Sequence, residues 1–222
     1  SSVTLHAPYS MSPRLRNLVS QQVVAQEVPL SIHFLESEEE RQIFSTLDGP
    51  MMDLFRGWGL AFSPHTYSSP VDYVLEALPK GVPSLLVHCT QIQQAEMQGI
   101  AQGWPKAHFV LCPLANAYIH NTQPPARMLM EVTDQVALGT DSLAGNERLS
   151  ILAEMQTLQQ SQEIPTKHLL RWASQNGARA LQLPDEEFRI AEGAQPRLVG
   201  ITNVQGDHAE LTTSSEAHLI SH

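Results

Sequence analysis

The chain has 222 residues, 42% of them hydrophobic, which is enough to bury the core of one large or two modest domains. Its formal net charge of −10 and the absence of a basic patch or arginine-rich helix exclude a typical nucleic-acid partner, and no apolar run approaches the ~20 residues of a membrane span. The two cysteines, Cys89 and Cys112, lie in or beside apolar segments and form no C-x-x-C pair. This favours the reducing cytoplasm and argues against a cysteine zinc site.

Hydrophobic periodicity and capping residues divide the chain into alternating short strands and helices. Ser12-Pro13 and Ser69-Pro70 indicate helix starts, because serine caps a helix and proline suits its first position. In chain order we expect a strand at 3–6, a helix at 13–26, a strand at 29–33, helices at 38–47, 51–58 and 69–78, a strand at 83–88, a helix at 90–102, a strand at 108–112, a helix at 124–131, a strand at 136–140, and helices at 146–161 and 165–181.

Some segments carry further expectations about burial. The apolar helix at 51–58 begins an insertion, 51–68, that either walls a pocket or forms a satellite core. The tail, 205–222, is either loosely ordered or a β-appendage. The last two helices should bury one apolar face each, formed by Leu149, Leu152 and Met155 in the first and by Leu169, Leu170, Trp172, Ala173 and Ala178 in the second.

The predicted strands end in chemically distinctive side chains at a regular spacing, namely His6, His33, His88, Cys112 and Asp141. A (β/α)8 barrel spends about 30 residues on each strand–helix unit. The spacing here is close to that value, apart from one longer interval that contains the insertion. The chain is therefore predicted to be an α/β protein with five consecutive units of a barrel that needs eight for closure.

Residues at the carboxyl ends of parallel strands converge on one mouth of such a barrel, where catalytic groups lie. Three imidazoles (His6, His33 and His88) and the carboxylate of Asp141 therefore predict a divalent metal site suited to zinc or iron. Glu36 follows His33 in the pattern H-x-x-E and could turn back over the mouth to carry a proton. The alternative is that the histidines are hydrogen-bonded rim residues and the two acids belong to helix N-termini.

Several motifs, in order and spacing, resemble the amidohydrolase superfamily in its deaminase/chlorohydrolase branch. That branch includes S-adenosylhomocysteine/methylthioadenosine, guanine and aminofutalosine deaminases and triazine hydrolases. The resemblance covers about residues 3–204. It rests on His6-Ala-Pro-Tyr-Ser10, His33-Phe-Leu-Glu36, Leu86-Val-His88-Cys89, Cys112-Pro-Leu-Ala-Asn116, Gly139-Thr-Asp141-Ser-Leu-Ala-Gly-Asn146, Asn176-Gly-Ala-Arg-Ala-Leu181 and Glu192-Gly-Ala-Gln-Pro-Arg-Leu-Val199.

The resemblance implies a fold and a role for each site residue. Residues 1–183 would form the C-terminal portion, about strands 4–8, of a (β/α)8 TIM barrel, and residues 184–222 part of a small β-sandwich. His33 and Asp141 would bind one divalent metal, zinc in the first place and iron as the alternative. Glu36, His88 and Asp141 would be catalytic: Glu36 shuttles protons, His88 orients or polarises the attacked group, and Asp141 takes a proton from metal-bound water. Substrate contacts would come from His6, His88 and Asn146.

The implied activity is that of a cytoplasmic, homo-oligomeric, metal-dependent aminohydrolase. It would attack a purine-like ring carbon of a small-molecule substrate with metal-bound hydroxide and release ammonia, with no nucleic-acid or membrane partner. The family's first two metal ligands form H-x-H, which this sequence lacks. We therefore expect the chain to be part of a longer enzyme and to be inactive alone. Ala115 and Gly145 stand where serine is common, which leaves the substrate open.

Two other functions are compatible with the sequence. One is a related hydrolase that expels chloride or cleaves an amide or cyclic ureide. The other is a degenerate half-barrel that only binds or supports a partner. The absence of H-x-H supports this second alternative. The pattern H-x-x-E favours deamination over the release of chloride or the cleavage of an amide or cyclic ureide. The presence of Glu36 and Asp141 together with His33 and His88 argues against the second, because a scaffold has no need of acids beside these histidines.

Overall fold

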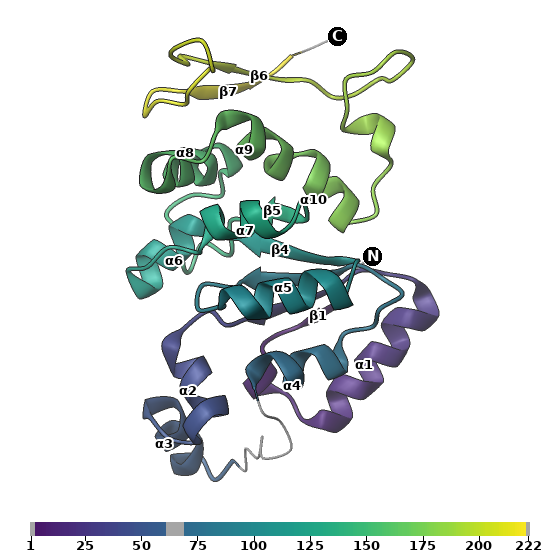
Figure 1. The fold of residues 1–222 in the computed structure, drawn as a ribbon, viewed down its shortest axis with the longest axis vertical. Helices are drawn as coiled ribbons and strands as arrows, with labels where there is room; N and C mark the ends of the chain where they lie inside the picture. Colours follow the sequence, from purple (N-terminus) through teal and green to yellow (C-terminus); the bar gives the residue numbers. More distant parts are fainter. Residues whose placement is uncertain (1–2, 61–68, 221–222) are drawn as a thin grey trace. The chain divides into compact units, whose positions relative to one another are not determined.

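The computed structural model describes residues 3–60 and 69–220, and the chain divides into two compact units, 1–107 and 108–222 (Figure 1). Part of the predicted insertion, 61–68, and the last two residues of the tail lie outside the described residues. The expected domain boundary after residue 183 stays a prediction. In the two described ranges, no helix is both long and apolar enough to cross a membrane.

The first unit contains a parallel sheet of β1 (Val3–Leu5), β2 (Leu30–Phe34) and β3 (Ser84–His88). Leu5 of β1 is level with Ile32 of β2, and Phe34 of β2 is level with His88 of β3. Because the strands run in the same direction, their carboxyl ends share one edge of the sheet. The three predicted strand-end histidines of this unit therefore lie along that edge, and the predicted strands are confirmed to within two residues.

Helices follow the strands of the first unit at the places that the capping residues indicate. Ser12, Ser37 and Ser69 each accept the backbone N–H three residues ahead, as N-cap serines do. A short 3₁₀ helix, η1 (Pro8–Ser10), follows β1. The α-helices are α1 (Pro13–Gln26), α2 (Glu38–Thr46), α3 (Pro50–Gly57), α4 (Pro70–Ala77) and α5 (Gln94–Gly103).

The second unit begins with the parallel pair β4 (Ala107–Leu111), which starts at the boundary, and β5 (Val136–Leu138). Every residue of both strands is buried, as expected for parallel strands covered on both faces. Gly139, which follows β5, approaches β4 closely: a Cβ atom there would lie 3.1 Å from Val110 Cγ1 and 3.3 Å from Cys112 Sγ. The absence of a side chain at Gly139 lets the chain leave β5 against its neighbour.

The helices of the second unit depart from the sequence prediction in three places. No helix was expected between the strand at 108–112 and residue 124, but one begins directly after that strand at Pro113, which occupies the first helical position, where its missing N–H costs nothing. The helix expected from 146 begins at 151 because Ser150 caps it. The long helix expected at 165–181 is interrupted at Ser174, whose φ and ψ are −129° and −84°. The observed helices are α6 (Pro113–His120), α7 (Ala126–Val132), α8 (Ile151–Gln162), α9 (Thr166–Ala173) and α10 (Gln175–Ala180).

These changes in helix boundaries alter the predicted buried faces. Leu149 precedes α8 and is 58% exposed, and Leu170 is 45% exposed, so both were wrongly placed in the core. Met155, Leu169 and Trp172 are buried as expected. The short helix α9 buries positions three residues apart, and Leu170 lies off that face.

The C-terminal tail is a β-appendage, which was one of the two expected alternatives. Its strand β7 (Glu216–Leu219) pairs antiparallel with β6 (Val199–Thr202), which precedes the tail and follows a 3₁₀ turn, η2 (Asp185–Glu187) (Figure 1). The segment between these strands is held on α8 by side-chain hydrogen bonds. Gln159 Oε1 accepts the Leu211 N–H at 2.6 Å, and Gln156 Nε2 donates to the Thr212 carbonyl at 2.6 Å.

Candidate metal and catalytic site

The imidazole of His33 is oriented by the backbone of the neighbouring strand end. His33 Nδ1 lies 2.7 Å from the carbonyl oxygen of His6, and the His33 backbone N–H donates to the same oxygen at 3.0 Å. A carbonyl can only accept, so Nδ1 carries a proton, and in the neutral ring Nε2 then keeps its lone pair. A backbone carbonyl that fixes the tautomer in this way is the usual second partner of a metal-binding histidine. His33 therefore fits the role of a metal ligand through Nε2.

His88 lies beside His33 at the end of β3 and is fully buried. The two rings stack, with centroids 5.3 Å apart and an interplanar angle of 23°. His88 and the next residue, Cys89, have positive φ values of 73° and 52°, which non-glycine residues adopt at a cost. The Cys89 N–H donates to the Phe34 carbonyl at 2.9 Å, so the hydrogen bonding of β2 continues through this strained turn.

Glu36 faces His88 from the turn after β2. Its Oε1 lies 3.7 Å from His88 Nε2, and the Glu36 side chain is 20% exposed. The first unit thus brings together His33, Glu36 and His88 from the ends of two neighbouring strands. A partly solvated carboxylate beside a buried imidazole is suited to moving a proton between solvent and a reacting group.

His6 adjoins this group at the end of β1. Its ring centroid is 5.5 Å from that of His33, and its Nδ1 lies 2.9 Å from Ser10 Oγ. The His6 side chain is exposed. Its role in substrate contact stays a prediction, whereas its carbonyl already has a function in holding the His33 ring.

Two residues that the sequence did not single out also belong to this part of the first unit. Burial, and after it the negative charges of Glu40 and Glu36, raise the pKa of Tyr9 to about 12, so this phenol keeps its proton at neutral pH. Burial also raises the pKa of the Glu40 carboxyl to about 7. Tyr9 stands in the first motif and Glu40 in an S-x-x-E pattern. In sequence, both resemble ordinary turn and helix-start residues.

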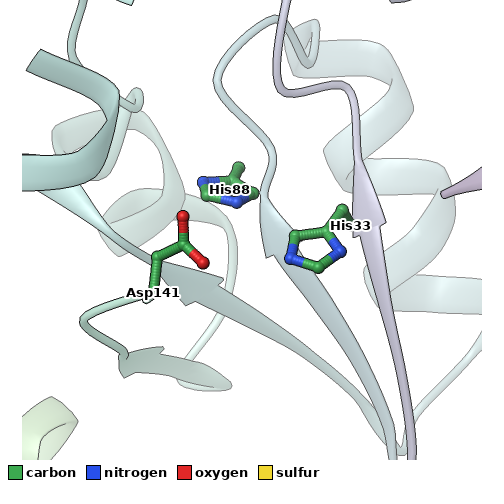
Figure 2. A group of neighbouring side chains, drawn as sticks. All are labelled: His33, His88 and Asp141. Carbon is green, nitrogen blue, oxygen red and sulfur yellow. The ribbon is translucent and has the colours of Figure 1, made fainter. Parts of the chain in front are cut away.

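In the second unit, Asp141 follows β5 on a left-handed backbone. Its φ is 57° and its side chain is half-buried. Gly145 lies close to it, since a Cβ at that position would stand 3.3 Å from Asp141 Oδ2 and 2.6 Å from the Ile119 side chain. Figure 2 shows His33 and His88 at the ends of β2 and β3, and the Asp141 carboxylate on the segment after β5.

Asn146 is engaged inside the second unit. Its Nδ2 donates to the Thr140 carbonyl and to Glu154 Oε1, both at 2.8 Å, and its Oδ1 accepts the Arg148 N–H at 3.2 Å. These contacts close the loop that carries Asp141. Substrate contact by Asn146 stays a prediction, and the structure adds a loop-holding role that sequence reasoning missed.

Glu154 anchors the same loop from α8 and is fully buried. Its other oxygen, Oε2, accepts the Leu114 N–H at 2.8 Å in the first turn of α6. Burial raises the pKa of Glu154 to about 7, against the opposing effect of these hydrogen bonds. Only the tertiary contacts identify this glutamate, because along the sequence it is one acid on a helix.

The raised pKa of Glu154 predicts a pH-dependent stability. Its unfolded-state pKa is near 4.5. A group whose pKa is raised by folding contributes stability below its unfolded pKa and loses it as pH rises through the folded value. The free energy of unfolding should therefore fall between about pH 4.5 and 7, by up to about 3 kcal/mol from this group. Urea unfolding of Glu154→Gln should have a shallower pH dependence than wild type, whereas Glu147→Gln, at an exposed acid, should not. Identical slopes for all three proteins would contradict the prediction.

Comparison with known proteins places these residues in a family context. Residues 1–214 match the amidohydrolase family. A 5-methylthioadenosine/S-adenosylhomocysteine deaminase of Syntrophobacter fumaroxidans is 25% identical over 99% of this chain and 47% of its own length. An aminodeoxyfutalosine deaminase of Deinococcus radiodurans is 28% identical over 68% of this chain and 37% of its own length. The chain thus spans about half the length, or less, of these curated relatives.

Solved structures share the fold. The aminofutalosine deaminase of Helicobacter pylori superimposes with a TM-score of 0.71 at 24% identity, covering 81% of this chain and 46% of that one. An adenosine deaminase of Xanthomonas campestris with bound zinc superimposes with a TM-score of 0.63 at 22% identity, covering 83% of this chain and 39% of that one. These matches confirm the expected α/β fold with parallel strands.

Proposed function

Because this chain belongs to the amidohydrolase family, we propose that the complete protein is a metal-dependent aminohydrolase that removes an amino group from a purine-like ring. The observation that carries the proposal is the arrangement at the ends of β2 and β3. There a histidine with its Nε2 lone pair fixed by the His6 carbonyl adjoins the pair of His88 and Glu36. The sequence relatives named above are deaminases.

The donor atoms of three residues suit a divalent metal. His33, His88 and Asp141 each offer one ligand atom, and we propose that His33 and Asp141 hold the ion with His88 beside it. Two imidazoles and a carboxylate are donors that zinc prefers, with iron as the alternative. Both Asp141 and His88 stand on left-handed backbone, a conformation that is retained where a side chain must point in one direction. We further propose that β1–β5 correspond to strands 4–8 of a (β/α)8 barrel and that β6 and β7 belong to a β-sandwich.

The proposed roles follow from the chemistry of each side chain. A divalent metal lowers the pKa of bound water to about 7 and so supplies a nucleophile at neutral pH. Asp141 would accept a proton from the attacking water. Glu36 would deliver a proton to the departing amine, and His88, buried and within 3.7 Å of Glu36, would orient the group under attack. His6 and Tyr9 would border the ring, since both lie on the segment after β1.

Ammonia release by the complete protein tests the proposal. The substrates to assay are 5-methylthioadenosine, S-adenosylhomocysteine, 5′-deoxyadenosine, adenosine and aminodeoxyfutalosine, which the names of the relatives suggest. Chloride release from a chlorotriazine tests the alternative leaving group, which the triazine hydrolase fold neighbours suggest. We expect ammonia from at least one purine nucleoside. Chloride release without deamination, or neither activity in a metal-loaded sample, would overturn the proposal.

A further inference from the structure

A carboxylate that the proposed reaction does not use lies directly beneath the turn that carries Glu36. Glu40 is only 1% exposed. Its Oε1 accepts the Leu35 N–H at 2.9 Å, and its Oε2 accepts the Glu36 N–H at 3.0 Å. Both oxygens of a fully buried carboxylate are thus directed at two consecutive amides of this turn.

This arrangement differs from an ordinary helix start. Ser37 and Glu40 have the S-x-x-E spacing of a capping box, in which the glutamate should reach back to the backbone N–H of the capping serine itself. Ser37 does cap α2, since its Oγ accepts the Glu40 N–H at 3.2 Å. The Glu40 side chain, however, passes the Ser37 amide and binds the two residues before it. Capping of α2 therefore does not account for the contacts of this carboxylate.

The turn that Glu40 binds is strained and held from both sides. Leu35 is fully buried and has a φ of 48°, a left-handed conformation that costs a leucine of the order of 1–2 kcal/mol. The Leu35 carbonyl accepts the Gln91 N–H at 2.8 Å from the segment after β3. With the amide nitrogens fixed by Glu40 and the carbonyl fixed by Gln91, the direction in which the Glu36 side chain leaves the backbone is determined. That direction brings Glu36 Oε1 to 3.7 Å from His88 Nε2.

We propose that Glu40 is a positioning residue for Glu36: its buried carboxylate holds the Leu35 and Glu36 amides so that the Glu36 side chain faces His88. The inference rests on the proposed function, in which Glu36 transfers the proton. Glu40 itself does not contact substrate. A misplacement of about 1 Å at a reacting group costs about 10²-fold in rate, so loosening this turn should lower kcat and leave ground-state binding almost unchanged.

The test compares Glu40→Gln and Glu40→Asp with Ser37→Ala in the complete, metal-loaded protein. Glutamine has one acceptor oxygen for two amides, and aspartate keeps the charge but is one methylene shorter. Ser37→Ala weakens the same helix start without removing an acceptor from Leu35 or Glu36. For both Glu40 variants we expect kcat to fall about 10- to 100-fold, with KM changed less than about 2-fold and metal content unchanged. Ser37→Ala should keep kcat near wild type.

A double-mutant cycle gives a readout that a purely structural role would not move, and hydrogen exchange shows whether Glu40 holds the two amides. If Glu40 acts through Glu36, Glu40→Gln should cost little further activity in a Glu36→Gln background. The Leu35 and Glu36 amides should exchange faster in Glu40→Gln and remain protected in Ser37→Ala. Equal losses in Ser37→Ala, or additive losses in the double mutant, would overturn the inference. If no substrate is turned over by wild type, the proposed function fails, and the amide exchange still decides whether Glu40 holds the turn.

Discussion

Asp141→Asn is expected to lower kcat for deamination by about 10²- to 10⁴-fold in the complete protein, the range for loss of a positioned acid–base group. The amide has nearly the shape of the carboxylate but cannot accept a proton from water, and it is a weaker metal ligand. Asparagine also tolerates left-handed backbone better than most residues, so the φ of 57° at position 141 should persist. The loss would therefore report on chemistry rather than on a rearranged loop.

The measurement for Asp141→Asn is steady-state ammonia release, accompanied by metal content and thermal melting. A melting temperature close to that of wild type is the condition for interpreting the rate. Glu147→Gln, which neutralises an exposed acid outside the turn at Asp141, is the matched control and should retain full activity. Unchanged deamination by Asp141→Asn would remove Asp141 from the mechanism and with it the proposed aminohydrolase chemistry.

His33→Ala should lose the bound metal and, with it, the activity. The substitution removes the Nε2 donor whose lone pair the His6 carbonyl preserves through Nδ1. A site that loses one of its few protein ligands binds its ion far more weakly, because even the outer-shell partners of metal ligands are worth 10- to 100-fold in affinity. Metal analysis of the purified variant should therefore give a content well below that of wild type, with ammonia release lowered in proportion.

His6→Ala provides the matched control for His33→Ala. The contact between these two residues runs through the His6 backbone carbonyl, which alanine keeps. His6→Ala should therefore retain the metal, and any loss of activity should appear mainly in KM if the His6 side chain contacts substrate. Full metal content in His33→Ala would contradict the assignment of His33. Metal loss in His6→Ala alone would instead identify the His6 ring as a ligand.

Much of the first unit could be predicted because its signals are local. Serine caps at 12, 37 and 69 and apolar runs at β2 and β3 each act within a few residues, and the predicted helices and strands agree with the observed ones to within a few residues. In the second unit the same rules predicted fewer of the helix boundaries correctly. Pro113 is compatible with both a strand end and a helix start, and the break at Ser174 leaves no mark in the apolar pattern of 165–181.

The residues of the candidate site also fall into two groups: those that sequence order indicates and those that only the packing reveals. Sequence order alone indicated His33, Glu36, His88 and Asp141. Polar side chains that follow apolar strand patterns can be recognised in the sequence, and parallel strands bring their carboxyl ends to one edge of a sheet. The family assignment, which the match over residues 1–214 confirms, rests on that order. Sequence could therefore name the candidate reactive groups, and their catalytic roles stay predictions.

Only the tertiary structure identified the residues that hold those groups in place. Glu40 and Glu154 read as ordinary helical acids, yet both are buried and hydrogen-bonded through both oxygens. Glu40 accepts two amides of the turn after β2, and Glu154 accepts the Asn146 side chain of the loop after β5 and the Leu114 N–H of α6. The His6 carbonyl that fixes the His33 tautomer is a backbone atom with no residue signature at all. Such partners depend on burial and on contacts between elements far apart in the chain, and neither is encoded in local spacing. Residue type and order thus determined the family to which this chain belongs and the candidate groups of its site, and packing decided how these groups are held.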